Sequence, residues 1–465
     1  MSPFQFKNYQ PRPLEIIDTT LREGSQSSLL HDHYKYFFTQ SDKVEIARSL
    51  IIYGVKFIEL FAPIVSPRER DDFQAIKTVR DELIMQKGYT FLLAHVRCHP
   101  DDIESAIEAG ADGLNIYIRL SDTARFSHGK DIETVINRAR SLIEDVRKNH
   151  PDLILRFSGE DAFRTSEDDL FRVYDQIAPF VDRFGTPDTV GVATPATVVR
   201  RLDLLRQHYP QVEFEGHFHD DRGFSLVNAL EAVKNGMRYI QTTLLGVGDR
   251  SGITSITALL YNLYIDKYYD HLEGYSLRGS YPINVMFASK MKKLVPSKEP
   301  VSLTNRTHTA GVHQQAMLNH GSTYEPFPLD QFGVTESEML LGPLSGWNMI
   351  YYFLKEIKYY NLDEGTAREI AAVFKERIYD YKSGTSPTTA LIDIAEKEFG
   401  LSRLAIPEQF KDNILQRMDE ESKNEATVVA PAEGDPEARR NTAVTLKPDI
   451  VLKAFTSPQI ATDDR

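Results

Sequence analysis

The chain has 465 residues, more than an average domain and enough to bury a large core. Its 67 acidic residues outnumber its 54 basic residues, and the formal net charge of −13 argues against general nucleic-acid binding. The single cysteine, Cys98, excludes an intrachain disulfide and a zinc site built from cysteines. We see neither a signal peptide nor an apolar run that approaches a membrane helix, and we therefore expect a cytoplasmic protein that does not bind membranes.

Short apolar segments alternate with longer amphipathic segments over the first half of the chain. In the helical pattern FSLVNALEAVKNG, for example, Leu226, Leu230 and Val233 form one apolar stripe. Eight such strand–helix units predict an α/β fold, a (β/α)8 TIM barrel within residues 1–270. A doubly wound open sheet is the alternative, although no G-x-G-x-x-G follows the first strand. The expected strands are LEIID, VKFIELF, TFLLAHV, GLNIYIRL, LILRFS, VDRFG, VEFEGHF and YIQTTLLG.

The alternation stops at about residue 270. We expect residues 271–335 to form a mixed connecting or lid region. Residues 336–417 are expected to form a small helical domain, because SGWNMIYYFLKEIKYYNLDEGTAREIAAVFKERIYDY has the pattern of two helices. The composition of residues 418–465 is polar and charged for much of their length, which predicts a disordered acidic tail.

Polar side chains follow most of the expected strands. Because barrel enzymes carry their functional residues at the C-terminal ends of the strands, we take these side chains as the candidate site. They are Arg22, Glu23, His95, Arg156, Ser158, Glu160, Thr189, His217 and His219.

The segment GHFHDDRG places His217 and His219 two residues apart, so that both imidazoles share one face of a strand. Together with Glu23 they would form a set of two imidazoles and one carboxylate with open positions for a bidentate substrate, which suits a divalent metal acting as a Lewis acid. Two alternatives need no metal: ordinary polar histidines at a strand end, and an ion pair between Glu23 and Arg22. Arg156 is either structural or a bidentate carboxylate clamp.

Seven motifs occur in an order that resembles a known family: DTTLREGSQ, HVRCHP, SHGKD, RFSGEDAFR, DTVGVATP, GHFHDD and GVGDRSGITS. From about residue 14 to about residue 378 the chain is similar to the homocitrate synthase branch of the DRE-TIM metallolyases, a group that includes isopropylmalate and citramalate synthases. The similarity extends to THTAGVH and STYE beyond the expected barrel.

The resemblance implies a condensation of acetyl-CoA, as co-substrate, with a 2-oxo acid. It implies that a divalent metal (Zn, Mn, Mg or Co) is held by Glu23, His217 and His219. Arg22 would polarise the keto group of the 2-oxo acid and stabilise the alkoxide that develops. Hydrolysis of the thioester would then release CoA.

The resemblance also assigns the acid–base groups and the assembly. His313 in THTAGVH would remove the methyl proton of acetyl-CoA, assisted by Tyr324 and Glu160. It implies a homodimer in which the segment after the barrel caps the barrel of the neighbouring subunit.

The 2-oxo acid is expected to be a dicarboxylate. Arg156, Ser158 and Thr189 match the residues that hold the distal carboxylate of 2-oxoglutarate in homocitrate synthases, and Arg22 and His95 complete the substrate site. GDRSGIT lacks the asparagine of isopropylmalate synthases. We therefore predict homocitrate formation, typical of lysine biosynthesis. Oxaloacetate giving citrate and 2-oxoisovalerate giving 2-isopropylmalate are the alternatives.

Three features depart from the family pattern. Ser25 stands where REGEQ has a glutamate, and the following loop is longer than usual. Asn115 replaces an aspartate of lysine-sensitive homocitrate synthases, while Glu215 is retained. The loss of one carboxylate weakens a site for the lysine ammonium group, so we do not expect feedback inhibition by lysine.

Two other functions, a retro-aldol lyase and a non-catalytic binding module, are alternatives to the synthase. A retro-aldol lyase, such as hydroxymethylglutaryl-CoA lyase, uses a cysteine late in the barrel, whereas Cys98 lies early in this chain. A non-catalytic binding module would have lost a metal ligand or Arg22, and all of these residues are present.

Overall fold

The computed structural model describes residues 13–28, 30, 37–120, 132–380 and 385–404, together with the backbone of residues 444–446. The SHGKD motif, part of the loop after the first strand and nearly all of the expected acidic tail lie outside the described residues. Within the described ranges, no helix is both long enough and apolar enough to cross a bilayer.

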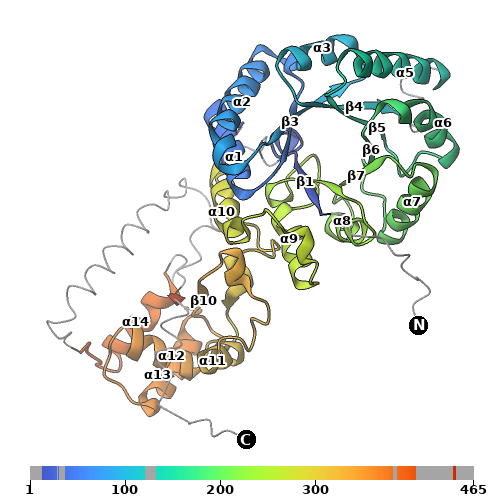
Figure 1. The fold of residues 1–465 in the computed structure, drawn as a ribbon. Coiled ribbons are helices and arrows are strands. Elements are labelled where there is room, and N and C mark those ends of the chain that lie inside the picture. The colour runs from blue at the N-terminus through green and yellow to red at the C-terminus, as the bar shows by residue number, and fades with distance from the viewer. Residues whose placement is uncertain are drawn as a thin grey trace, which may run out of the picture. The chain divides into compact units, whose positions relative to one another are not determined.

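Eight parallel strands form a closed barrel, because β8 pairs with β1 as well as with β7 (Figure 1). This confirms the predicted TIM barrel and excludes the open sheet. The strands are β1 Glu15–Asp18, β2 Phe57–Phe61, β3 Phe91–Arg97, β4 Gly113–Arg119, β5 Ile154–Glu160, β6 Arg183–Asp188, β7 Glu213–Phe218 and β8 Tyr239–Thr242.

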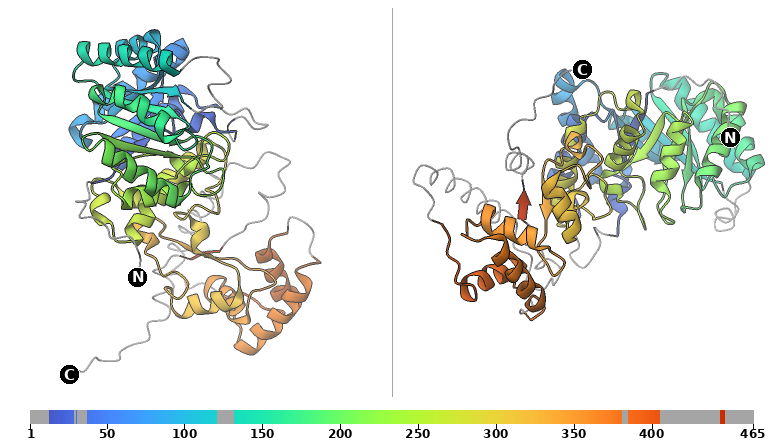
Figure 2. Two further views of the ribbon diagram at one scale, coloured as in Figure 1. Left: turned by 90° about the vertical axis from the view of Figure 1, so that its right-hand side faces the viewer. Right: turned by 90° about the horizontal axis from the view of Figure 1, so that it is seen from below.

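Helices surround the barrel and bury their apolar faces against it (Figures 1 and 2). The stripe expected on α8 is present: Leu230 and Val233 are buried, and Leu226 packs against the same core. These helices are α1 Gln40–Tyr53, α2 Pro67–Lys87, α3 Pro100–Glu108, α5 Ile132–Asn149, α6 Glu167–Ile177, α7 Pro195–His208 and α8 Ser225–Lys234, followed by α9 Ile256–Ile265 and α10 Ser280–Lys290.

The barrel interior changes character along its axis. Near the strand starts, Ile17, Phe57 and Leu93 form an apolar cluster, referred to below as the floor cluster. Alternate residues of each strand face inward, so the next inward positions, two residues further on, form a second layer. That layer contains the buried polar side chains of Glu59, Asn115, Arg156, Glu215 and Gln241. The floor is therefore mainly apolar, although the buried guanidinium of Arg183 lies over the rings of Phe57 and Tyr239, and further polar groups gather toward the C-terminal ends of the strands.

The chain divides into two compact units, one of residues 1–302 with 329–333 and the other of residues 303–328 with 334–465. The second unit has its own apolar core, which includes Met349, Phe353 and Phe374. Its elements are β9 Thr307–His308, α11 Gly311–Asn319, β10 Ser337–Met339, α12 Trp347–Tyr352, the π-helix η9 Phe353–Ile357, α13 Glu364–Arg377, α14 Pro387–Lys397 and β11 Val444–Leu446.

A small sheet in the second unit joins distant parts of the chain. β10 pairs in parallel with β9 and antiparallel with β11. The three residues of β11 thus form a strand within the range for which a disordered tail was expected.

Candidate active site

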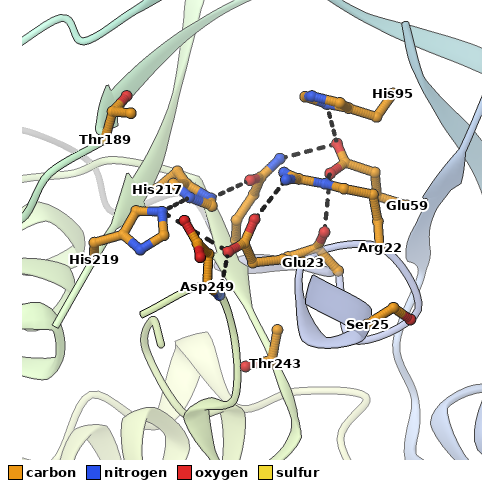
Figure 3. A network of polar contacts seen from close by, with 12 residues as sticks. Arg22, Glu23, Ser25, Glu59, His95, Thr189, His217, His219, Thr243 and Asp249 are labelled. Carbon is orange, nitrogen blue, oxygen red and sulfur yellow. Dashed lines mark hydrogen bonds and ion pairs between the residues drawn. The ribbon is translucent and has the colours of Figure 1, made fainter. Parts of the chain in front are cut away.

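Glu23, His217 and His219 converge at the C-terminal end of the barrel (Figure 3). One potential ligand atom from each lies within 4.8 Å of the others, and all three residues are buried. The Nε2 atoms of the two histidines are 3.1 Å apart, and Nε2 of His219 lies 3.9 Å from Oε1 of Glu23. Ligands at about 2.0–2.2 Å from one ion are at most about 4.4 Å apart, so these two separations fit a single divalent metal.

The two histidines are suited to bind a metal because they are neutral. Burial, reinforced by the neighbouring His219, lowers the pKa of His217 to about 3. Burial also lowers the pKa of His219. Since a metal binds the unprotonated nitrogen of an imidazole, no bound proton has to be displaced at neutral pH.

Glu23 uses its two oxygens differently. Oε2 accepts from Nη1 of Arg22 at 2.5 Å, while Oε1 accepts from the backbone N–H of Asp249 at 2.9 Å and faces His219. Burial raises the pKa of Glu23, but interactions that favour the carboxylate, led by the charge of Arg22 and including the N–H of Asp249, outweigh it and lower the pKa to about 2. The ion pair with Arg22, considered above as an alternative to metal binding, is present and leaves Oε1 facing the histidines.

Glu59, on β2, is a site residue that the sequence reading missed. Burial raises the pKa of this fully buried carboxylate, but Arg22, His95 and Arg156 together outweigh it and hold the pKa well below its usual value. Nε of Arg22 donates to it at 2.9 Å, which fixes Arg22 beside the triad. A single acidic residue among the apolar residues of FIELF was the available signal. Its other donors are Thr19, Asn115 and Gln241.

Arg156, the expected carboxylate clamp, is buried inside the barrel. Its Nε lies 3.0 Å from Oε1 of Glu215, and its Nη1 donates to Oγ of Ser158 at 3.1 Å. A Cβ at position 185 on β6 would overlap the guanidinium, so Gly185 provides the space that Arg156 occupies. Arg156 and Ser158 therefore lie together, as their shared strand face predicts.

His95 and Thr189 also lie at this end of the barrel (Figure 3). His95 stacks on Tyr117 with ring centroids 4.7 Å apart, and burial together with the charge of Arg22 lowers its pKa. The hydroxyl of Thr189 accepts from the backbone N–H of Asp161 at 2.9 Å, which leaves its own hydrogen available for a ligand. Glu160 is half-buried and forms an ion pair with Arg119 at 3.2 Å.

Ser25, which stands in the position of the family glutamate, points away from the triad in Figure 3. Its hydroxyl donates to the carbonyl of Leu21 at 3.1 Å within the same turn. In this structure Ser25 therefore shapes the turn that carries Glu23 and contributes no ligand atom.

His313 and Tyr324 belong to the second unit. Their rings are close, with centroids 4.0 Å apart, and the Tyr324 side chain is exposed. The structure thus brings these two residues together as the resemblance implies. Their action on a substrate in the barrel stays a prediction.

The loop GVGDRSG after β8 ties three strand ends together. Its Arg250 donates to Oδ1 of Asp221 at 2.7 Å and to the carbonyl of Thr189 at 2.6 Å. The N–H of Asp249 in the same loop holds Glu23. The GVGDRSG motif is recognisable in the sequence. Its contacts with the ends of three strands depend on the closed barrel and cannot be read from the sequence.

The fold and the site define a TIM-barrel protein with a buried centre of two histidines and one carboxylate beside two buried arginines. Residues 13–280 match the HMGL-like family, and residues 301–382 match the homocitrate synthase post-HMGL domain-like family. The chain belongs to the HMGL-like family and, within it, to the homocitrate synthase-like acyltransferases.

Individual relatives agree with this assignment. The mitochondrial homocitrate synthase of Schizosaccharomyces pombe is 33% identical over 388 residues, covering 80% of this chain and 88% of the relative. The cytosolic isozyme of Saccharomyces cerevisiae is 34% identical over 366 residues, covering 78% and 81%. 2-Isopropylmalate synthase 1 of Caldanaerobacter subterraneus subsp. tengcongensis is 29% identical over 372 residues, covering 78% and 90%.

Solved structures agree at the level of the fold. The HMG-CoA lyase of Bacillus subtilis superposes with a TM-score of 0.51 at 22% identity, covering 62% of this chain and 97% of the lyase. The hydroxymethylglutaryl-CoA lyase of Pseudomonas aeruginosa gives a TM-score of 0.52 at 17% identity, covering 62% and 96%. At these identities the likeness concerns the barrel alone.

Proposed function

We propose that this protein condenses acetyl-CoA with 2-oxoglutarate and hydrolyses the thioester, so that acetyl-CoA, 2-oxoglutarate and water yield homocitrate and CoA. The observation that carries the substrate assignment is the buried pair of Arg156 and Ser158 on the inward face of β5. A branched-chain 2-oxo acid would place an apolar group against the buried guanidinium of Arg156. The second carboxylate of a dicarboxylic acid can instead accept two hydrogen bonds from this guanidinium.

A divalent ion (Zn, Mn, Mg or Co) held by Glu23, His217 and His219 would supply Lewis acidity at the keto group of the 2-oxo acid. Ion pairs with Glu23 and Glu59 hold the guanidinium of Arg22 beside the proposed metal position. Arg22 therefore stabilises negative charge on the keto oxygen without first having to reorganise.

His313 is the proposed base for the methyl proton of acetyl-CoA. The ring of Tyr324, 4.0 Å away between centroids, would hold the imidazole in place, and Glu160 would assist from the rim of the barrel. In the proposed homodimer, His313 acts on the barrel of the neighbouring subunit.

The distal carboxylate of 2-oxoglutarate is assigned to Arg156, Ser158 and Thr189, with His95 completing the substrate pocket. Glu215 already neutralises part of the charge of Arg156. This pairing keeps the guanidinium oriented before the substrate arrives, so that little ordering remains to be done on binding.

We assign the protein to the cytoplasm and to lysine biosynthesis. The support for the pathway comes from the homocitrate synthases among its relatives. The names of the Saccharomyces cerevisiae enzymes include a cytosolic and a mitochondrial form.

The decisive experiment measures metal-dependent release of CoA from acetyl-CoA with 2-oxoglutarate, oxaloacetate, 2-oxoisovalerate and pyruvate. We expect 2-oxoglutarate to be the best acceptor. Arg156→Ala should lower kcat/KM for it by about 100-fold or more, because a buried charge pair is broken. Arg200→Ala, which removes an exposed arginine paired with Glu167, is the matched control and should change nothing.

Other outcomes discriminate among the alternatives. Preference for a monocarboxylic acid, insensitive to Arg156→Ala, would overturn the substrate assignment and leave only the condensation chemistry. Absence of turnover with all four acids would favour the acyl-CoA lyase or a binding module, and cleavage of hydroxymethylglutaryl-CoA would then identify the lyase.

A further inference from the structure

Gln241 occupies the centre of the barrel beneath the triad. It lies on β8, is 1% exposed, and contacts three ionisable side chains that come from two other strands. Its Nε2 lies 3.1 Å from Oε2 of Glu59 and 2.9 Å from Oε1 of Glu215, and its Oε1 lies 2.5 Å from Nδ1 of His217.

The orientation of this amide follows from its neighbours. Glu59 is ionised, and Glu215 is paired with the guanidinium of Arg156, so both carboxylates can only accept hydrogen bonds. The NH2 group of Gln241 must therefore face the two carboxylates. This leaves the carbonyl oxygen Oε1 toward His217, and because that oxygen can only accept, Nδ1 of His217 must carry the proton.

We infer that Gln241 is a positioning residue that fixes His217 in the Nδ1–H tautomer, with Nε2 unprotonated and directed at the metal position. This inference rests on the proposed metal centre of Glu23, His217 and His219. The partner of the second nitrogen of a ligand histidine sets its tautomer and ring orientation, and its removal typically weakens metal binding about 10- to 100-fold.

Gln241 also separates two negative charges. An amide is neutral, and its two N–H groups satisfy one oxygen of Glu59 and one of Glu215 at the same time. Glu59 holds Arg22, and Glu215 holds Arg156. A single side chain therefore links the metal ligand His217 to the carboxylates that hold both arginines of the proposed substrate site.

The test is a Co²⁺ titration of the full-length protein, followed by the visible absorption of the bound ion, and a competition with Zn²⁺. We expect Gln241→Leu to weaken metal binding about 10- to 100-fold. Asn284→Leu removes another buried amide of the same unit, which donates to Thr257 and Val301, and should bind metal as the wild type does.

Equal affinity of Gln241→Leu and wild type would overturn the inference. If the wild type itself binds neither Co²⁺ nor Zn²⁺, the proposed metal centre fails, which is a different result from a failure of Gln241.

A second measurement needs no variant at position 241. In the metal-free protein labelled with ¹⁵N-histidine, the ring nitrogen shifts report the tautomer of each histidine, and His217→Asn identifies the signal of His217. A signal with the proton on Nδ1 supports the inference, and a signal with the proton on Nε2 overturns it. This result decides the role of Gln241 even if Gln241→Leu does not fold.

Discussion

Glu59 accepts hydrogen bonds from four side chains although it lies in a strand of otherwise apolar residues. One of its donors is the amide of Asn115 on β4, which is itself fully buried. The carboxylate can remain ionised in the barrel because each neighbour presents a donor or a positive charge. A change of residue 115 is therefore expected to alter the charge balance inside the barrel, in addition to any effect on ligand binding.

Asn115→Asp is expected to destabilise the protein by about 1–3 kcal/mol at neutral pH. The substitution replaces a donor to Glu59 with a second carboxylate, so that two negative charges face each other in a buried site. Urea denaturation at pH 7 measures the change. Asn115→Ala, which loses the hydrogen bond without adding charge, is the control and should cost less.

The same residue bears on regulation. We expect lysine not to inhibit the wild-type enzyme, since only Glu215 of the two carboxylate positions is acidic and Arg156 already pairs with it. Inhibition of CoA release by millimolar lysine would contradict this prediction.

At the scale of elements, the backbone conformation of the GVGDRSG loop determines where the N–H group that binds Glu23 lies. Gly252 has φ +84°, and a Cβ there would overlap the carbonyl oxygen of Gly246. Asp249, whose N–H binds Glu23, lies between these glycines in the loop. The conformation of the loop and the placement of a metal ligand are thus linked.

Gly252→Ala is expected to lower the free energy of unfolding by more than about 2 kcal/mol and to weaken metal binding, because the loop has to move away from Glu23. Gly223→Ala is the matched control. Gly223 has a similar φ of +73° but no atom within 4 Å of an added Cβ. It should cost only the backbone penalty of about 1–2 kcal/mol and leave metal affinity unchanged. Equal losses of stability and affinity in both variants would contradict this account.

The elements themselves were predictable from the sequence. Strand segments such as GLNIYIRL and helices such as α8 show their periodicity locally, and the TIM barrel follows from their number and order. The convergence of Glu23, His217 and His219 was predictable because His217 lies at the C-terminal end of a strand and the other two follow such ends. Glu59 and Gln241 were not predictable, because their contacts depend on the register and closure of the whole barrel, which brings β2 and β8 to the same level inside it.

At the scale of the whole molecule, many charges inside the first unit are balanced by pairing, and Glu299 is one of the exceptions. Glu299 is buried and accepts from the hydroxyl of Thr257 at 3.0 Å, with no ion pair among the described residues. Burial raises its pKa to about 7, although hydrogen bonds from Ser255 and Thr257 oppose the shift. The folded protein therefore binds a proton at Glu299 more tightly than the unfolded chain does.

This difference predicts a pH-dependent stability. Because the folded pKa is raised, the stabilising contribution is fully present below pH about 4.5 and is lost as the pH rises through 7. Between pH 4.5 and 8 the wild type should lose up to roughly 3 kcal/mol relative to Glu299→Gln. Denaturant unfolding across this range measures the difference. Glu104→Gln, at an exposed position on α3, should give a difference from wild type that does not depend on pH.

The floor cluster has a consequence for the passage of molecules through the barrel. Ile17, Phe57 and Leu93 fill the interior near the strand starts, and the triad lies at the opposite, C-terminal end. In the proposed reaction, a small acid held at Arg156 is expected to enter from the triad end before a larger co-substrate covers it, and the product that retains this acid is expected to leave last. The order of binding would then follow from the position of Arg156 inside the barrel.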